Sequence, residues 1–276
     1  IPDKQSVDWS VWKQGKETDP VITNGDVEIA FTEFGDIASI SSGELQISQY
    51  RPGQHDAGIA GLWLRRHDGN GITSTPLIGV HSNSNWGAEG GTAVWKGSDL
   101  GASWTVTLAI DPESPTWAWH VRVDAASSDT ASLYIVTDQD LALAPRAQAL
   151  TSEPYISQYI AYRSADLPGL GRVVAARQTM SSAPKMPLLV SAIKEGAQAH
   201  LTDGFDFYGK QARLGSRPQM LDDATWDGGR TNQYEFGMIA LLSNSEKASQ
   251  EGLEWTEVLT FDPDFRGELP DACEDY

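Results

Sequence analysis

The sequence predicts an all-β fold: a large super-sandwich of two antiparallel sheets, galactose-mutarotase-like, with few or no helices. Segments that alternate between apolar and polar residues recur along most of the 276-residue chain. Clusters of Gly, Asn, Asp and Pro separate these segments, as in RHDGNG, WGAEGG and WDGGRTN. Helical patterns are scarce, and NSEKASQEGLEW could hold a short turn at most. We therefore expect no helix longer than about three turns.

The expected strands follow one another along the chain. In order, they read DVEIAFTE, ASISSGELQISQY, AGLWLRRH, GASWTVTLAI, TWAWHVRVDA, ASLYIVTDQDLAL, GRVVAARQTM, MPLLVSAIK, QYEFGMIALLS and EWTEVLTF. In WTVTLAI and WAWHVRVDA, alternation puts one face in a core and leaves Thr or Arg on the other face. About a dozen such strands make two packed sheets of about six or more strands each. We expect residues 1–276 to form a single domain, with residues 1–20 as an N-terminal arm.

Charge and composition exclude several classes of partner. The 38 acidic and 20 basic residues give a net charge of −18, which repels nucleic acid. The chain has no run of about 18 apolar residues, so no membrane span is expected. The first residues lack the basic and apolar segments of a signal peptide, and the single Cys273 excludes an intrachain disulfide. These features favour the cytoplasm and leave a bacterial periplasm open.

Familiar metal and catalytic patterns are missing from the sequence. The five His residues show no ligand spacing, and DGNGITS at 68–74 lacks the final Glu of a calcium loop, so a hairpin turn is preferred. No Gly-x-Ser-x-Gly occurs. Paired acids such as Asp138 and Asp140 arise by chance in a chain with 38 acids. We therefore predict no metal, no cofactor and no catalytic residue.

The most distinctive stretch is SEPYISQYIAYRSADLPGLGRVVAARQTM, residues 152–180. Its tyrosine rings, amides and guanidinium groups suit sugar faces, sugar hydroxyls or a carboxylate. ADLPGLG looks like the loop of a hairpin, so polar residues of both strands could share one face. A solvated face whose arginines pair with nearby acids is an equally good interpretation. The candidate residues are Tyr155, Gln158, Tyr159, Arg163, Arg177 and Gln178, joined by Asp203, Tyr208 and Lys210 of LTDGFDFYGK.

Odd and even positions along a strand predict which of these candidate residues point to the same side. Tyr155, Tyr159 and Arg163 have the same parity and would point to the same side of a strand. Gln158 has the opposite parity, so it needs a bulge or a strand end to join them.

Three runs together resemble a known family. EPYISQYIAYR…GRVVAARQ, HLTDGFDFYGKQAR and NQYEFGMIALLS are similar to the N-terminal β-sandwich of inverting glycoside phosphorylases of glycoside hydrolase family 94, especially those acting on 1,2-β-oligoglucans. The resemblance is clearest over residues 152–243. It implies a cytoplasmic, often dimeric enzyme in which the sandwich precedes an (α/α)₆ barrel that carries the general acid. Residues 244–276 would then form a C-terminal strand and a tail leading to that barrel.

The resemblance implies a non-catalytic sandwich that supports the barrel and contacts either the barrel or a β-linked gluco-oligosaccharide. A stand-alone protein remains the alternative. It could be a carbohydrate-binding module, supported by ten Trp residues. It could be an aldose mutarotase that uses His81 or His120 with Glu235. A hydrolase is a further option, and so is a polysaccharide lyase, for which Tyr159, Arg163, Arg177 and Gln178 are suitable residue types.

Overall fold

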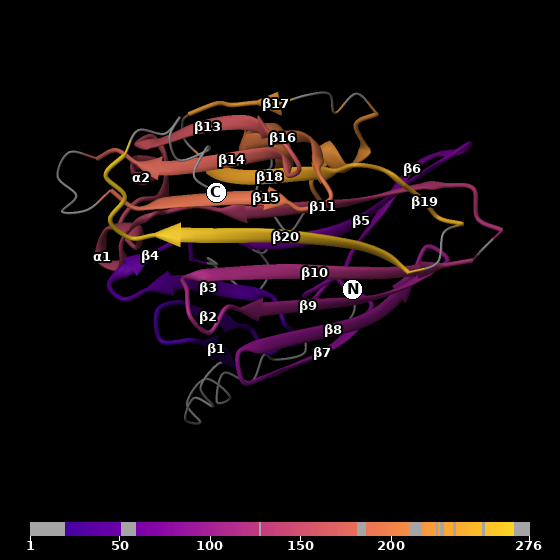
Figure 1. Ribbon diagram of the computed structural model, residues 1–276, viewed down its shortest axis with the longest axis horizontal. Helices are drawn as coiled ribbons and strands as arrows, with labels where there is room; N and C mark the ends of the chain where they lie inside the picture. The colour runs from indigo at the N-terminus through magenta and orange to yellow at the C-terminus, as the bar shows by residue number, and fades with distance from the viewer. Residues whose placement is uncertain are drawn as a thin grey trace, which may run out of the picture.

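The eight-stranded sheet forms one complete layer of the molecule (Figure 1). The computed structural model describes residues 20–50, 59–126, 128–180, 186–209, 217–224, 226, 229–233, 236–249 and 252–267. Within them, the strands of this sheet lie in the spatial order β13 (Ile160–Leu167), β14 (Gly171–Gln178), β15 (Leu188–Ile193), β20 (Leu253–Asp262), β10 (Thr116–Ala125), β9 (Ala102–Ile110), β8 (Thr92–Asp99) and β7 (Ser84–Glu89).

The second layer consists of two sheets behind the first (Figure 1). The seven-stranded sheet has the order β17 (Gly229–Arg230), β16 (Ala197–Asp203), β18 (Gly237–Ser243), β11 (Ser132–Asp140), β5 (Ala60–Asp68) and β6 (Gly71–Pro76), with β19 (Glu246–Lys247) beside β11. The five-stranded sheet has the order β1 (Val21–Thr23), β2 (Glu28–Phe31), β3 (Ile37–Ser42), β4 (Leu45–Gln46) and β12 (Ala144–Pro145). Within the described residues, β16 and β17 pair in parallel and the other pairs are antiparallel.

Strand alternation builds the core between the layers. On β9 and β10, one set of alternate residues is buried and the other is partly or fully exposed, which confirms the predicted alternation. One continuous cluster of buried apolar side chains takes residues from all three sheets and includes Trp95, Trp117 and Trp255. All three sheets therefore share one hydrophobic core.

Helices are few and short in the described residues, as predicted. They are α1 (Arg146–Ala149), α2 (Glu153–Ser157), α3 (Gly204–Tyr208) and the 3₁₀ turn η2 (Gln219–Asp222). None of them is long or apolar enough to cross a membrane. The all-β prediction is confirmed. The expected strands did not include β1, β6, β7, β8 and β16 or the two-residue strands β12, β17 and β19, and the division of the second layer into two sheets was not predicted.

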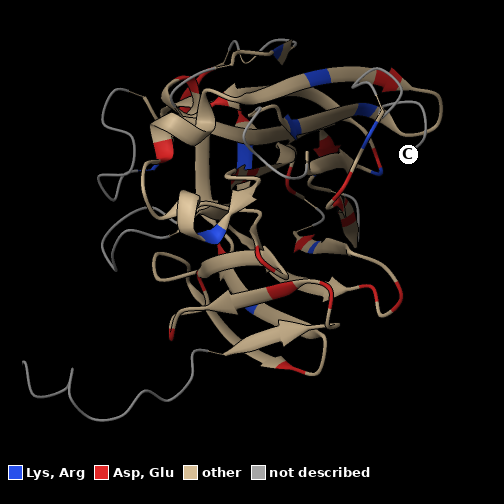
Figure 2. Cartoon of the chain, turned by 90° about the vertical axis from the view of Figure 1, so that its left-hand side faces the viewer, with Lys and Arg blue, Asp and Glu red and all other residues tan. Residues whose placement is uncertain are grey.

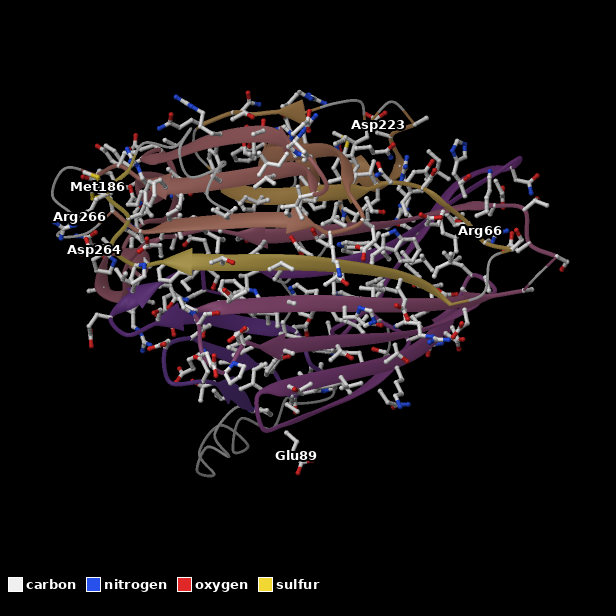
Figure 3. All side chains as sticks on the ribbon, viewed as in Figure 1. Arg66, Glu89, Met186, Asp223, Asp264 and Arg266 are labelled. Carbon is white, nitrogen blue, oxygen red and sulfur yellow. The ribbon has the colours of Figure 1, made fainter. Side chains whose placement is uncertain are left out.

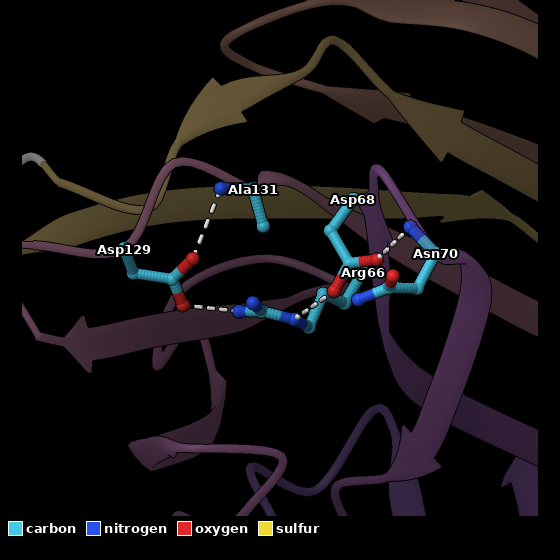
Figure 4. A network of polar contacts seen from close by, with 5 residues as sticks. All are labelled: Arg66, Asp68, Asn70, Asp129 and Ala131. Carbon is cyan, nitrogen blue, oxygen red and sulfur yellow. Dashed lines mark hydrogen bonds and ion pairs between the residues drawn. The ribbon is translucent and has the colours of Figure 1, made fainter.

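DGNGITS forms the β5–β6 hairpin turn, as the sequence predicted (Figure 4). Asp68 accepts hydrogen bonds from the backbone of Asn70 and from Arg66. Arg66 also pairs with Asp129, whose other oxygen accepts from the backbone of Ala131. This network fastens the hairpin to the β10–β11 connection and lowers the pKa of the Asp129 carboxyl, chiefly through the bond from Arg66.

Candidate functional site

The first predicted residues lie on a helix, not on a strand. Ser152 caps α2, with its hydroxyl accepting from the backbone of Tyr155, and a proline occupies the first turn. The strand expected through Tyr155 is therefore wrong, because a capped helix start precedes β13. Tyr155 and Tyr159 still meet, since residues four apart at a helix end lie on one side, and their rings pack edge to face at 5.4 Å.

Gln158 closes the C-terminal end of α2. Its side-chain amide donates to the carbonyl of Tyr155, and its own carbonyl accepts from the amide of Gln233. It joins the two tyrosines at the end of the sandwich that holds α1 and α2, which faces the viewer in Figure 2. Tyr155 is 51% exposed there.

The predicted hairpin exists, but it divides the remaining candidates between two faces. β13 and β14 pair antiparallel around ADLPGLG, with Arg163 opposite Ala175 and Arg177 opposite Ala161. Arg163 and Arg177 therefore share the outer face of the eight-stranded sheet. Gln178 points inward and is buried, and it donates to the carbonyl of Ala142. The expectation that all six residues share one sheet face is therefore wrong: only Arg163 and Arg177 do so, because Tyr155, Gln158 and Tyr159 lie at α2, before β13, and Gln178 points inward.

The LTDGFDFYGK residues lie elsewhere. Asp203 caps α3 by accepting from the backbone of Phe205. Tyr208 is buried on the outer face of the seven-stranded sheet, where its ring stacks on Phe236 at 5.8 Å. Lys210 lies outside the described residues. The structure thus separates Asp203 and Tyr208 from the arginines, which belong to the other sheet.

Tyr208 belongs to a polar cluster centred on Asp138, which sequence reasoning dismissed as a chance acid. The Tyr208 hydroxyl donates to Asp138 at 2.7 Å, and the Trp63 indole donates to the other carboxylate oxygen at 2.9 Å. Burial raises the pKa of the Asp138 carboxyl to about 6, against the lowering effect of these two hydrogen bonds. The available signal was parity: Asp138 lies on the same side of β11 as Tyr134 and Val136, which pack into the apolar cluster on the outer face of the seven-stranded sheet.

A second set of polar contacts, made by Arg65, holds η2 against the outer face of the seven-stranded sheet. Arg65, on β5, donates to the carbonyl of Leu221 at 3.0 Å and to that of Asp223 at 2.7 Å. Its guanidinium also lies 5.4 Å from the ring centre of Tyr134. Together, the Asp138 and Arg65 contacts hold α3 and η2 against the seven-stranded sheet, so this cluster acts as a structural fastener.

Two other groups with strongly shifted pKa values, Glu257 and His200, are also buried. Burial raises the pKa of Glu257 to about 7, and its carboxylate accepts from the Ser191 hydroxyl at 2.7 Å. Burial and the neighbouring Arg172 lower the pKa of His200 to about 4. His200 lies between Arg172 and the Thr231 hydroxyl, 3.0 Å from each. These side chains fill the interior, where a sugar cannot reach them.

The structure does not test the pairing considered for a mutarotase, because its glutamate, Glu235, lies outside the described residues. His120 lies on the outer face of the eight-stranded sheet, 3.2 Å from the Thr256 hydroxyl. Among the described residues, no group of three or more His, Cys, Asp or Glu side chains is placed to hold a metal ion.

Comparison with solved structures places the fold among sandwiches of carbohydrate-active proteins. A polysaccharide lyase matches with a TM-score of 0.54 and 11% identity over 90% of this chain and 33% of its own. A bacterial glucoamylase complexed with acarbose matches with a TM-score of 0.51 and 10% identity over 95% of this chain and 36% of its own. A protein from Escherichia coli K12 assigned as an aldose 1-epimerase matches with a TM-score of 0.51 and 8% identity, over 89% of this chain and 99% of its own. At these identities the likeness concerns the fold alone: a galactose-mutarotase-like sandwich.

Sequence comparison is more specific. The model of the SOGP N-terminal domain matches residues 30–256, so this chain belongs to that family. A 1,2-beta-oligoglucan phosphorylase from Listeria innocua serovar 6a is 26% identical over 220 residues. That match covers 80% of this chain but only 19% of the relative. The chain thus matches about a fifth of the length of this relative.

Proposed function

We propose that this chain is the non-catalytic N-terminal sandwich of a glycoside phosphorylase that acts on β-linked gluco-oligosaccharides of the 1,2-β-glucan type. In this proposal it supports an (α/α)₆ barrel domain of the same enzyme, which carries the general acid. The observation that carries the proposal is the family match combined with coverage of only 19% of a 1,2-beta-oligoglucan phosphorylase.

The chemistry of the described residues supports a non-catalytic role. A general acid or base must reach the bond it acts on, and its pKa works best near the operating pH. The side chains with such values, Asp138 and Glu257, are 3% and 7% exposed and are engaged in structural hydrogen bonds. A stand-alone mutarotase or lyase would need such groups at an open surface.

Within this proposal, the predicted residues at the α2 end serve as a contact surface for the barrel or for the entering oligosaccharide. Tyr155 and Tyr159 offer paired aromatic rings, and Arg163 is exposed beside them in the chain. Tyrosine and arginine are the residue types enriched at protein interfaces, and both also suit sugars. Enzyme dimers formed through the barrel or the sandwich are compatible with this arrangement.

The test compares two purified proteins: this chain and the longest product of its gene. With 1,2-β-oligoglucans and inorganic phosphate, we expect sugar 1-phosphate from the longer product and none from residues 1–276 alone. Phosphorolysis by residues 1–276 alone would contradict a non-catalytic role. A gene that encodes nothing after residue 276 would contradict the larger enzyme.

A second experiment examines the contact surface by single substitutions in this chain. Arg163→Ala should leave thermal unfolding of this chain nearly unchanged, because exposed arginine contacts contribute about 0–1 kcal/mol. It should weaken the association of the separately expressed barrel with the sandwich, or oligosaccharide binding, by roughly 1–3 kcal/mol. Arg230→Ala, a 52% exposed arginine on β17 of the seven-stranded sheet, is the matched control and should change neither quantity.

A further inference from the structure

The outer face of the eight-stranded sheet carries an uncharged band that crosses most of its strands. Cross-strand partners align in one row, whose members on six successive strands are Val173, Ala192, Val258, Ala118, Ala109 and Thr92. Directly opposite residues of antiparallel strands point to the same side, and the alternate set on these strands fills the core. This row therefore faces away from the sandwich.

The rows on either side of it are uncharged as well. On one side lie Ala175, Val190, Thr260 and Thr116. On the other side lie Thr256, His120, Thr107 and Val94. The residues named in these three rows include no Asp, Glu, Lys or Arg, although such residues make up 21% of the chain, which has a net charge of −18. The first row ends in charge at Glu89 on β7, opposite Thr92, and the second at Arg163 on β13, opposite Ala175.

Charged residues lie at the border of the band. The next row contains Glu254, Arg122 and Lys96, and Arg163 and Arg177 lie at the β13–β14 edge. An uncharged centre with a charged rim is the residue distribution of a protein interface, whose core is depleted of charged residues. A solvated sheet face in an acidic protein would instead carry charges throughout.

One part of the band is already covered by the polypeptide that follows β20. Val173, Ala175, Leu188, Val190 and Ala192 are at most 6% exposed and form a cluster against which Phe265 packs. Arg177 donates to the carbonyl of Gly267 at 2.5 Å, which holds this segment close to the sheet edge. After its last strand, the chain thus turns onto the outer face of the sheet.

We propose that the outer face of the eight-stranded sheet is the surface on which the rest of the larger polypeptide docks. The inference rests on the proposed function, since it needs a domain after this one. The family is that of an N-terminal domain, and the chain covers only 19% of its relative, so most of such a protein lies outside this sandwich. In this proposal, the segment after β20, which packs on the outer face through Phe265, forms the first part of the docked polypeptide. A second copy of this chain and a free oligosaccharide are the other occupants that the test must separate.

The test measures thiol reactivity at the centre of the band. In a Cys273→Ser background, Ala118→Cys and Val258→Cys introduce small side chains on neighbouring strands, and Ser103→Cys is the matched control outside the three rows. Each variant is prepared as residues 1–276 and as the longest gene product, and the alkylation rate with a maleimide reagent is measured. Residues 1–276 should react at all three positions.

In the longer product, alkylation at positions 118 and 258 should slow by about tenfold or more, because a docked surface must open before it reacts. Position 103 should react at a similar rate in both proteins. Equal rates at 118 and 258 in a longer product that is active would overturn the docking surface and leave the proposed function standing. Protection in residues 1–276 alone that grows with protein concentration would assign the face to a second copy and overturn the proposal. Protection of positions 118 and 258 that requires added 1,2-β-oligoglucan would assign the face to the sugar and would also overturn the proposal.

Discussion

Glu257 has a buried carboxyl in the space between the two large sheets, where it accepts a hydrogen bond from the neutral Ser191 hydroxyl. Burial disfavours the charged form and raises the pKa from its ordinary value of 4.5 to about 7. The folded state therefore binds this proton more tightly than the unfolded state does. The resulting stability is present below pH 4.5 and is lost as the pH rises through about 7. Asp138, with its pKa raised to about 6, acts in the same direction at slightly lower pH.

Glu257→Gln should remove this pH dependence. Glutamine cannot ionise and can still accept from Ser191, so at pH 8 the variant should have a free energy of unfolding higher than that of the wild type by about 1–3 kcal/mol. At pH 5 the two proteins should differ much less. Urea denaturation at pH 5, 6, 7 and 8 measures both.

Glu254→Gln provides the control for this experiment. Glu254 lies on the same strand, but its side chain is 48% exposed, so the substitution should leave the slope against pH nearly unchanged. If wild type and Glu257→Gln show parallel curves from pH 5 to 8, the raised pKa of Glu257 is wrong.

At the scale of the strand, Gly237 shows how closely the two layers approach. It begins β18, and a Cβ built there would lie 2.7 Å from the Tyr162 hydroxyl on the facing sheet and 3.2 Å from Ile160. Both neighbours are fully or almost fully buried. A side chain larger than hydrogen at this position must push the sheets apart.

Gly237→Ala should therefore destabilise the protein by roughly 1–3 kcal/mol, the usual cost of overpacking a core. Gly87, on the edge strand β7, is the matched control, since a Cβ there meets no atom within 4 Å. Gly87→Ala should be neutral or slightly stabilising, because it restricts the unfolded chain. Equal thermal melting temperatures for the two variants would contradict this account of the interlayer packing.

The strands show what the sequence can reveal about this fold. TWAWHVRVDA is β10 from its first residue to its last, because one of its faces is buried and the other is not. SEPYIS was wrongly read as part of a strand, although Ser152, Glu153 and Pro154 form a helix-start signal. A helix of five residues is too short for periodicity to reveal, so its cap was the only local sign.

The candidate site was harder to predict than the strands. Parity correctly put Arg163 and Arg177 on one face, since the hairpin register follows from a recognisable loop. The Asp138 cluster joins β5, β11 and α3, and its members lie 75 and 70 residues apart. Such contacts depend on how sheets and connections pack, which no local pattern contains. The uncharged band on the eight-stranded sheet likewise appears only when six strands are aligned.

For the whole molecule, the shared core predicts a single unfolding transition. Phe31, on the small five-stranded sheet, is fully buried and packs against Trp86 and Trp95 of the eight-stranded sheet. The small sheet therefore has no separate core on which it could unfold first.

Phe31→Ala should lower the free energy of unfolding by about 3–5 kcal/mol while keeping one transition. Tryptophan fluorescence and far-ultraviolet circular dichroism should give coincident urea curves for wild type and variant. Phe34→Ala, at a position 47% exposed in the same region, should change stability by less than about 1 kcal/mol. Two separated transitions would show that the five-stranded sheet is an independent unit.

The position of β20 sets the timing of folding during synthesis. This last strand lies in the middle of the eight-stranded sheet, between β15 and β10, although it is made long after β10 (Figures 1 and 3). On the ribosome, β10 and β15 each wait with an unpaired edge until β20 emerges. At ordinary rates of translation the wait for β10, from Ala125 to Leu253, lasts on the order of ten seconds. The eight-stranded sheet therefore remains in two unjoined halves for that interval, when a chaperone would protect the nascent chain most.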